Sequence, residues 1–347
     1  MEHRLLIGTY TEHLPHVDGV APGLLSATFD GTRLSEARLE VPLTNPSWVT
    51  ASPDGGHVYA VEETGPDGGI ATIELRDGGL YPRGMDSAGG ADPAHVVVHP
   101  SGRFLLTGTY GGGTVSVYAI RPDGTLGART AFVQHEGHGA DAARQDAPHV
   151  HQLSVDPVTG DVVVVDLGLG EVRWYALSDD GSLELRPEAT VVTGASGPRH
   201  LAFHPDGAHA LLVNELDSTL DVLRRDGDRF VRVHSVPTRA PGTDGPNLPA
   251  AVRVTAEGGT VLVTNRGDDT VAVFGFDAGS STADFVAAVP AGGRAPRDLV
   301  LSPEGDRVLV ACQDSREVTV FAFDAADRSL TPLGSQEIPT PVCLLFL

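Results

Sequence analysis

The sequence predicts an all-β fold built from repeated units of four antiparallel strands, and three observations support this prediction. Glycine (42 residues) and proline (25 residues) are abundant, whereas stretches with helical periodicity are scarce. Short runs of β-branched residues recur along the chain, and tight turns that contain glycine separate them. The turn glycines recur at a nearly constant spacing, since Gly55, Gly102, Gly160, Gly207, Gly258 and Gly305 are 47, 58, 47, 51 and 47 residues apart.

The strands follow the same order in each repeat. Residues 95–110 (HVVVHPSGRFLLTGTY) are typical of a first strand, a tight turn and a second strand. Residues 113–120 (GTVSVYAI) are typical of the third strand, and the turn at residues 121–124 (RPDG) leads to the fourth. The order recurs in residues 160–168, 200–215, 259–276 and 298–323.

The two ends of the chain are expected to complete one unit together. A proline precedes the first strand at Pro46, Pro93, Pro198, Pro249, Pro296 and Pro341, and Pro148 takes this place, slightly offset, in the remaining unit. The last unit has only its first strand, residues 341–347 (PVCLLFL), but residues 5–11 (LLIGTYT) echo residues 105–111 (LLTGTYG). We therefore expect one domain, residues 1–347, that forms a seven-bladed β-propeller whose terminal strands share a blade.

Composition restricts the classes of partner. The 24 Lys and Arg residues against 46 Asp and Glu residues give a formal net charge of −22, which disfavours nucleic acid and anionic membranes. The two cysteines, Cys312 and Cys343, are too few for a disulfide framework and are typical of a reducing compartment. No run approaches 18 apolar residues, and the first residues contain no signal-peptide core. We expect a cytoplasmic monomer or homodimer with no nucleic-acid or membrane partner.

Register within the repeat maps a site. In a propeller, equivalent positions of all blades face the same axis. The residue after the pre-strand proline, or its counterpart, is Ser47, Ala94, His151, Arg199, Ala250, Arg297 or Val342. The residue eight positions after each turn glycine is Glu63, Tyr110, Gly168, Glu215, Arg266 or Gln313, with Tyr10 as the seventh. Because the first two strands are antiparallel neighbours, both sets should line one mouth of the channel.

Charged residues at these positions favour a ligand site. The register brings together five polar residues and, directly after Arg199, His200. The five are His151, Arg199, Glu215, Arg266 and Arg297. Buried charges are costly unless they pair with one another or meet a ligand. A self-neutralised Arg–Glu network that only joins the blades is the alternative. Asp268 and Asp269, just past the ring position, are expected to be solvated loop charges.

Two histidines one residue apart, in PHVHQ (residues 148–152), raise the question of a metal site. His135, His138, His149 and His151 are near one another in sequence, but HxxH followed by HxH has no established single geometry. We expect no metal and no cofactor. His149 is expected to line the rim.

The chain resembles the seven-bladed propeller lactonase family, which includes bacterial propeller-type 6-phosphogluconolactonases and fungal carboxy-muconate cycloisomerases. The resemblance runs from end to end and rests on an ordered series of motifs: residues 143–157 (ARQDAPHVHQLSVDP), 166–177 (DLGLGEVRWYAL), 197–207 (GPRHLAFHPDG), 213–223 (VNELDSTLDVL), 261–274 (VLVTNRGDDTVAVF), 295–313 (APRDLVLSPEGDRVLVACQ) and 341–347 (PVCLLFL). It implies that His151, Arg199, Glu215 and Arg266 form the active site. One departure is Ala251, where relatives often carry an acidic residue.

The resemblance implies a metal-independent lactone hydrolase of carbohydrate metabolism, most simply a 6-phosphogluconolactonase of the pentose phosphate pathway that acts on a small anionic sugar lactone. His151 is the favoured general base, because the unperturbed imidazole pKa of about 6.5 suits neutral pH. Glu215 is expected to stay ionised and hold the arginines. The residues expected to contact substrate are His149, His200, Arg297, Tyr110, Glu63 and Gln313. The alternatives are a 3-carboxy-cis,cis-muconate cycloisomerase and a non-catalytic propeller that binds a protein.

Overall fold

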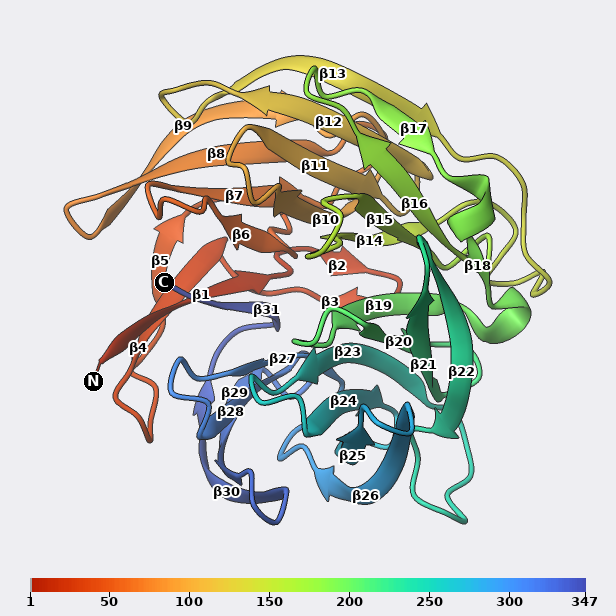
Figure 1. Cartoon of the computed structure of the whole chain (residues 1–347). Coiled ribbons are helices and arrows are strands. Elements are labelled where there is room, and N and C mark those ends of the chain that lie inside the picture. The colour runs from red at the N-terminus through yellow and green to blue at the C-terminus, as the bar shows by residue number, and fades with distance from the viewer. Residues whose placement is uncertain (1) are drawn as a thin grey trace.

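The computed structural model of the chain describes residues 2–347, and its sheets confirm the predicted ring of seven four-stranded antiparallel blades (Figure 1). One blade has the strand order β31-β1-β4-β5, so the two terminal strands pair as the sequence predicts. The N- and C-terminal ends accordingly lie close together in Figure 1. No helix among residues 2–347 is long and apolar enough to cross a membrane.

The strand bounds follow the repeat. The closing blade consists of β31 (Pro341–Phe346), β1 (His3–Thr9), β4 (Leu24–Phe29) and β5 (Arg38–Val41). Blades 1 to 3 consist of β6 (Val49–Ala51), β7 (His57–Glu62), β8 (Gly69–Arg76) and β9 (Gly79–Ser87); β10 (Pro93–Val98), β11 (Phe104–Thr109), β12 (Thr114–Ile120) and β13 (Leu126–Gln134); and β14 (Val150–Val155), β15 (Val162–Asp166), β16 (Glu171–Leu177), β17 (Leu183–Leu185) and the short β18 (Val191–Val192).

Blades 4 to 6 consist of β19 (Pro198–Phe203), β20 (His209–Asn214), β21 (Thr219–Asp226) and β22 (Arg229–Pro237); β23 (Leu248–Val254), β24 (Thr260–Arg266), β25 (Thr270–Asp277) and β26 (Thr282–Pro290); and β27 (Pro296–Leu301), β28 (Arg307–Cys312), β29 (Glu317–Asp324) and β30 (Ser329–Glu337). Outside the blades are the hairpin β2 (His13–Leu14) and β3 (Val17–Asp18) and the 3₁₀ turns η1 (Pro187–Ala189) and η2 (Gly194–Ser196).

The core lies between neighbouring blades. Because the blades stack face to face, their inner strands are buried on both sides and read as continuous apolar runs. All five residues of β15 are buried, for example. Val163 and Val165 of blade 3 belong to the same apolar cluster as Leu212 and Leu223 of blade 4. Cys312 and Cys343 are buried free thiols within strands.

A β-bulge on the innermost strand explains why one ring position faces the channel. The strand pairing skips one residue at this position in five blades, and these residues are Ala94, His151, Arg199, Arg297 and Val342. In blade 5 the shift spans Ala250 and Ala251. A bulged residue has no partner in the ladder, and the local kink re-aims its side chain. The predicted ring position is therefore a bulge repeated around the axis.

Candidate active site

Glu215 is the centre of the polar site. It follows β20, and its carboxylate accepts hydrogen bonds from Arg266 Nη2 (2.5 Å, to Oε2) and Arg144 Nη2 (2.5 Å, to Oε1). Arg199 Nε lies 3.0 Å from Oε2 and completes the ion pairing. The Glu215 side chain is only 4% exposed, so three arginines from separate parts of the chain surround one buried carboxylate.

This surrounding fixes the charge of Glu215. Burial alone would raise the pKa of its carboxyl group, but the positive charges of Arg266, Arg199 and Arg144 outweigh burial and hold the pKa well below its ordinary value. Glu215 is therefore ionised at neutral pH. Its position supports the role expected from the sequence, which is to hold arginines rather than to accept a proton.

His151 is a buried imidazole with a vacant nitrogen. Its ring lies edge-on to the rings of Tyr110 and His200, with centroids 5.8 and 5.2 Å away. Its Nδ1 has no hydrogen-bond partner among residues 2–347. Burial and the nearby charge of Arg199 lower the pKa of His151 well below its ordinary value. The imidazole is therefore neutral near pH 7, with a lone pair on one ring nitrogen.

A second polar chain crosses the site from blade 6 to blade 1. Arg297 Nη1 donates to Gln313 Oε1 (3.2 Å), and Nη2 donates to the Tyr10 hydroxyl (3.1 Å). Tyr10 in turn donates to Glu63, at 2.9 Å from both carboxylate oxygens, and Ser47 Oγ also donates to Glu63. Burial raises the pKa of Glu63 although Arg297 acts in the opposite direction. This chain connects the closing blade to its two neighbours.

These groups enclose a cavity of about 500 Å³ at one mouth of the channel. Its lining residues are His16, Glu63, Ala94, Tyr110, Arg144, His151, Glu215, Leu248, Arg266, Ala295, Arg297, Gln313 and Asp314. Seven of the ten residues predicted for the site lie here. Arg199 and His200 lie deeper, where they line a small void with Tyr10, Trp48 and His151.

His149, the tenth predicted residue, does not line either space. Its ring stacks on Tyr110, with centroids 4.3 Å apart, and its Nδ1 is 2.9 Å from the Tyr110 carbonyl oxygen. His135 lies in a buried network in which Nδ1 is 2.6 Å from Asp166 Oδ2 and Nε2 is 2.9 Å from the Tyr175 hydroxyl. His138 Nδ1 lies 3.0 Å from the Gly139 carbonyl oxygen, so the hydrogen-bond partners of His135, His138 and His149 are different groups.

The register analysis missed two basic side chains of the cavity, Arg144 and His16, and both lie outside the repeat. Arg144 comes from the segment between β13 and β14, whose extra length produces the 58-residue spacing between Gly102 and Gly160. Buried Gln145 shapes this segment, since Oε1 accepts the backbone N–H groups of Ala140 and Asp141. His16 lies at the turn of the hairpin β2–β3. Unusual repeat length is the only sequence signal for Arg144.

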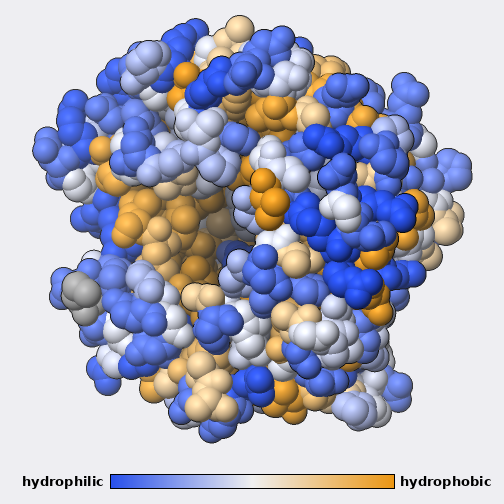
Figure 2. Space-filling view, viewed as in Figure 1, coloured by the Kyte–Doolittle hydropathy of each residue, from blue (hydrophilic) through white to orange (hydrophobic). Residues whose placement is uncertain are grey.

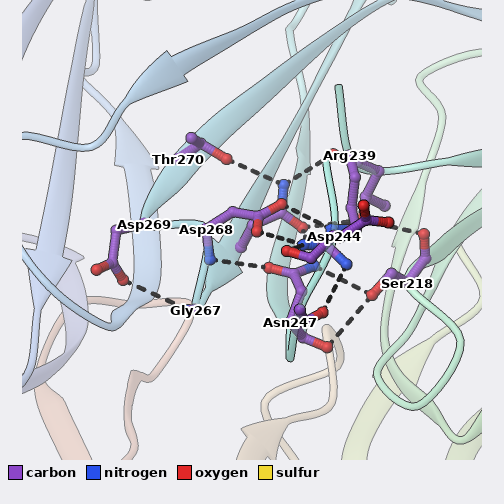
Figure 3. Close-up of polar contacts among 11 residues, drawn as sticks. Ser218, Arg239, Asp244, Asn247, Gly267, Asp268, Asp269 and Thr270 are labelled. Atoms are coloured by element: carbon purple, nitrogen blue, oxygen red, sulfur yellow. Dashed lines mark hydrogen bonds and ion pairs between the residues drawn. The ribbon is translucent and has the colours of Figure 1, made fainter. Parts of the chain in front are cut away.

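Asp268, two residues after Arg266, was expected to be a solvated loop charge, and the structure shows instead that it belongs to a polar network. Arg239 Nε and Nη2 donate to the two carboxylate oxygens of Asp268 at 2.8 and 2.6 Å, and the Asp268 side chain is 11% exposed rather than solvated (Figure 3). Asn247 Oδ1 accepts the Asp268 N–H at 3.3 Å. Asp269 Oδ1 accepts the Ala295 N–H at 2.8 Å, from the adjacent blade. Both aspartates therefore fix the segment that carries Arg266.

Ala251, which stands where relatives often carry an acidic residue, is fully buried. Its N–H donates to Thr264 Oγ1 (2.9 Å). Arg199 instead uses the adjacent Ala250 carbonyl, which accepts Nη1 at 2.7 Å. Glu215 and this carbonyl thus hold Arg199 without an acidic residue at position 251.

Arginine charges outnumber carboxylates in and directly below the cavity. Four arginines (144, 199, 266 and 297) face three carboxylates (63, 215 and 314), so four positive minus three negative charges leave +1 when all are ionised. Burial raises the pKa of Glu63, and burial also lowers the pKa of Arg199 and of Arg266, so these shifts act on the balance in opposite directions. In a chain of net charge −22, this mouth is a local concentration of positive charge.

The fold and the site together define a β-propeller with a polar, arginine-rich cavity at the end of its channel. Residues 4–346 match the family described as Lactonase, 7-bladed beta-propeller. A 6-phosphogluconolactonase of Bacillus subtilis is 32% identical over 98% of this chain and 97% of its own length. The chain therefore belongs to the seven-bladed β-propeller lactonase family.

Solved structures agree with this assignment. A putative 6-phosphogluconolactonase from Bacteroides fragilis superposes with a TM-score of 0.91 at 27% identity, covering 100% of this chain and 98% of that one. A periplasmic gluconolactonase from Pseudomonas aeruginosa superposes with a TM-score of 0.92 at 28% identity, covering 100% and 99%. These relatives support lactone hydrolysis as the class of reaction.

Proposed function

We propose that this chain is a 6-phosphogluconolactonase, which adds water to 6-phospho-D-glucono-1,5-lactone and releases 6-phosphogluconate in the pentose phosphate pathway. One observation carries the proposal: a neutral buried imidazole, His151, lies in a cavity where arginine charges outnumber carboxylates. The Bacillus subtilis relative carries the name of this activity. The arginines suit a substrate with an anionic tail, because guanidinium groups bind phosphate bidentately.

In the proposed reaction, His151 accepts a proton from water while the water oxygen bonds to the lactone carbonyl carbon. The carbonyl oxygen becomes an oxyanion, and an arginine N–H stabilises it. Arg199 suits this role, because among the arginines its charge acts most strongly on His151. The tetrahedral intermediate then collapses, the bond from the carbonyl carbon to the ring oxygen breaks, and that oxygen takes the proton from His151.

The remaining arginines suit the phosphate. Arg266 and Arg144 each use one terminal nitrogen for Glu215, so each has further N–H groups available to a ligand. Arg297 lines the same cavity and makes no direct hydrogen bond to Glu63 within residues 2–347. The Tyr10 hydroxyl lies between them, accepting from Arg297 and donating to Glu63. Tyr110 supplies an aromatic wall for the sugar. Binding the phosphate at a distance from His151 would leave the carbonyl carbon beside the base.

The proposal is tested by substrate preference. Hydrolysis of the freshly generated phosphorylated lactone and of D-glucono-1,5-lactone is measured, corrected for spontaneous opening, for the wild type and Arg266→Ala. We expect the wild type to prefer the phosphorylated lactone, and Arg266→Ala to lose most of that preference. A wild type that accelerates neither reaction would refute the proposal, and turnover of a carboxylated muconolactone would then favour the cycloisomerase.

A further inference from the structure

A short hairpin stands over the catalytic cavity. Strands β2 and β3 lie in the connection between β1 and β4 and pair with each other rather than with a blade. Figure 1 shows them near the middle of the ring. Their turn, Pro15–His16, brings His16 to the junction of three spaces: the 500 Å³ cavity and flanking grooves of about 860 and 560 Å³.

Contacts with the ring fix the hairpin in this place. Val17 packs in a buried cluster with Tyr10 and Val342, below the hairpin. Asp18 Oδ2 accepts a hydrogen bond from Arg316 Nη2 at 2.8 Å, and Gln313 Nε2 reaches the His16 carbonyl oxygen at 3.5 Å. The tip is therefore positioned over the cavity by contacts on two sides. Figure 2 shows a hollow in this view of the surface, among interspersed polar and apolar side chains.

The His16 ring faces the arginines without a partner of its own. Its centroid lies 5.3 Å from that of Tyr10, edge-on, and the imidazole makes no side-chain hydrogen bond within residues 2–347. Partial burial and then the charges of Arg297, Arg266 and Arg144 lower the pKa of His16 to about 4. Glu215 acts in the opposite direction but does not balance them. The net effect of the nearby charges on the His16 imidazole is therefore that of an excess of positive charge.

We propose that His16 is a specificity-determining residue that contacts the anionic end of the substrate from the hairpin side, opposite Arg144, Arg266 and Arg297. The inference rests on the proposed function, since it concerns the phosphate of the same substrate. A bound dianion among the arginines would reverse the field at His16 and favour the protonated imidazole. His16 would then donate a charge-assisted hydrogen bond. A neutral sugar lactone offers no such contact.

The test compares hydrolysis of 6-phospho-D-glucono-1,5-lactone and D-glucono-1,5-lactone by the wild type, His16→Ala and His16→Gln. The control is His13→Ala, because His13 lies on the same hairpin but outside the catalytic cavity. We expect His16→Ala to lower the preference for the phosphorylated lactone, as the ratio of kcat/KM values, by about tenfold, mainly through KM. His16→Gln, which retains a donor, should lose less, and His13→Ala should keep the wild-type ratio.

Binding of 6-phosphogluconate, measured by calorimetry, gives a readout that does not need turnover. His16→Ala should weaken this binding by about the same factor. An active wild type whose preference is unchanged in His16→Ala would overturn the inference and leave the lactonase proposal standing. An equal loss of preference in His13→Ala would also overturn it, since hairpin geometry rather than His16 would be responsible. A wild type inactive on both lactones would refute the proposed function and this inference with it.

Discussion

A single carboxylate, Glu215, organises the arginines of the candidate site. Glu215 forms ion pairs with three arginines, whose charges would otherwise repel one another in a buried place. Two of these arginines, Arg144 and Arg266, also line the cavity. Removing one partner of a buried ion pair lowers the free energy of unfolding, because the other partner remains as an uncompensated buried charge. We therefore expect the same group to support both folding and binding.

Glu215→Gln is predicted to lower the free energy of unfolding by about 3 kcal/mol, because three arginines lose their counter-charge. It is also predicted to reduce lactonase activity, since the arginines lose their positions. Urea unfolding and steady-state kinetics measure these effects. Asp18→Asn, which removes an exposed ion pair of the hairpin, is the control and should leave the unfolding midpoint nearly unchanged. Equal midpoints in the wild type and Glu215→Gln would contradict this view of Glu215.

The low pKa of His151 predicts an unusual pH profile. A general base works in its neutral form, so activity is lost as pH falls through the pKa of that base. Because burial and Arg199 lower the pKa of His151, kcat/KM should stay level from pH 8 to below pH 6. D-glucono-1,5-lactone is the suitable substrate, because a phosphate would itself titrate near pH 6. An acidic limb centred near 6.5 would be inconsistent with the environment of His151.

At the scale of elements, the site combines a repeated bulge with two irregular insertions. The bulges place His151, Arg199 and Arg297, and the ends of second strands place Glu215 and Arg266. The insertions add Arg144 and His16, which close the cavity from outside the ring. In the proposed mechanism, the repeat thus supplies the reacting groups, and the insertions complete the pocket around the anionic tail.

Arg144→Ala is predicted to raise KM for the phosphorylated lactone by about tenfold, with little change in stability. Glu215 retains Arg199 and Arg266, and the Arg144 side chain is partly exposed, which explains the limited effect on folding. Gln145→Ala should raise KM in the same direction, because Gln145 shapes the segment. The exposed Arg103→Ala serves as a surface control for kinetics and thermal unfolding. An unchanged KM in Arg144→Ala would show that this arginine only neutralises Glu215.

These same elements define what the sequence was able to predict. The turn glycines determined which residues share a ring position: Glu215 and Arg266 each lie eight residues after one and were both expected at the channel mouth. The structure places both in one cavity. Arg144 and His16 were missed because periodicity says nothing about insertions. The expectation for Asp268 was wrong because its partner, Arg239, lies in another loop. His149 was expected to contact the substrate but lies beside the cavity. The offset proline before β14 gave no register from which the position of its loop could be predicted.

At the scale of the whole molecule, the ring is closed by strands from opposite ends of the chain. β31 pairs with β1, and Leu344 packs with Leu5 and Ile7 in a cluster that also includes residues of blade 6. Closure removes the free sheet edges that an open array would expose. It also holds Tyr10 and Val342 beside the channel mouth, so the closure contributes to the site.

Leu344→Asp is therefore predicted to destabilise the ring strongly, by about 3 kcal/mol or more, because it buries an unpaired carboxylate at the closure. Leu347→Asp, three residues further on and 36% exposed, should leave the thermal midpoint almost unchanged. Thermal unfolding of both variants and the wild type measures the difference. Similar midpoints for the two variants would show that the terminal strand contributes little to holding the ring together.

The most direct test of the central claim is the chelator-treated rate of 6-phosphogluconolactone hydrolysis for the wild type and His151→Ala, corrected for spontaneous opening. We predict chelator-resistant acceleration by the wild type and a loss of about 10²-fold or more in kcat for His151→Ala, with little change in KM. Wild-type kcat in His151→Ala would contradict the claim that this buried imidazole is the general base. Loss of wild-type activity on chelation would contradict the metal-independent reaction.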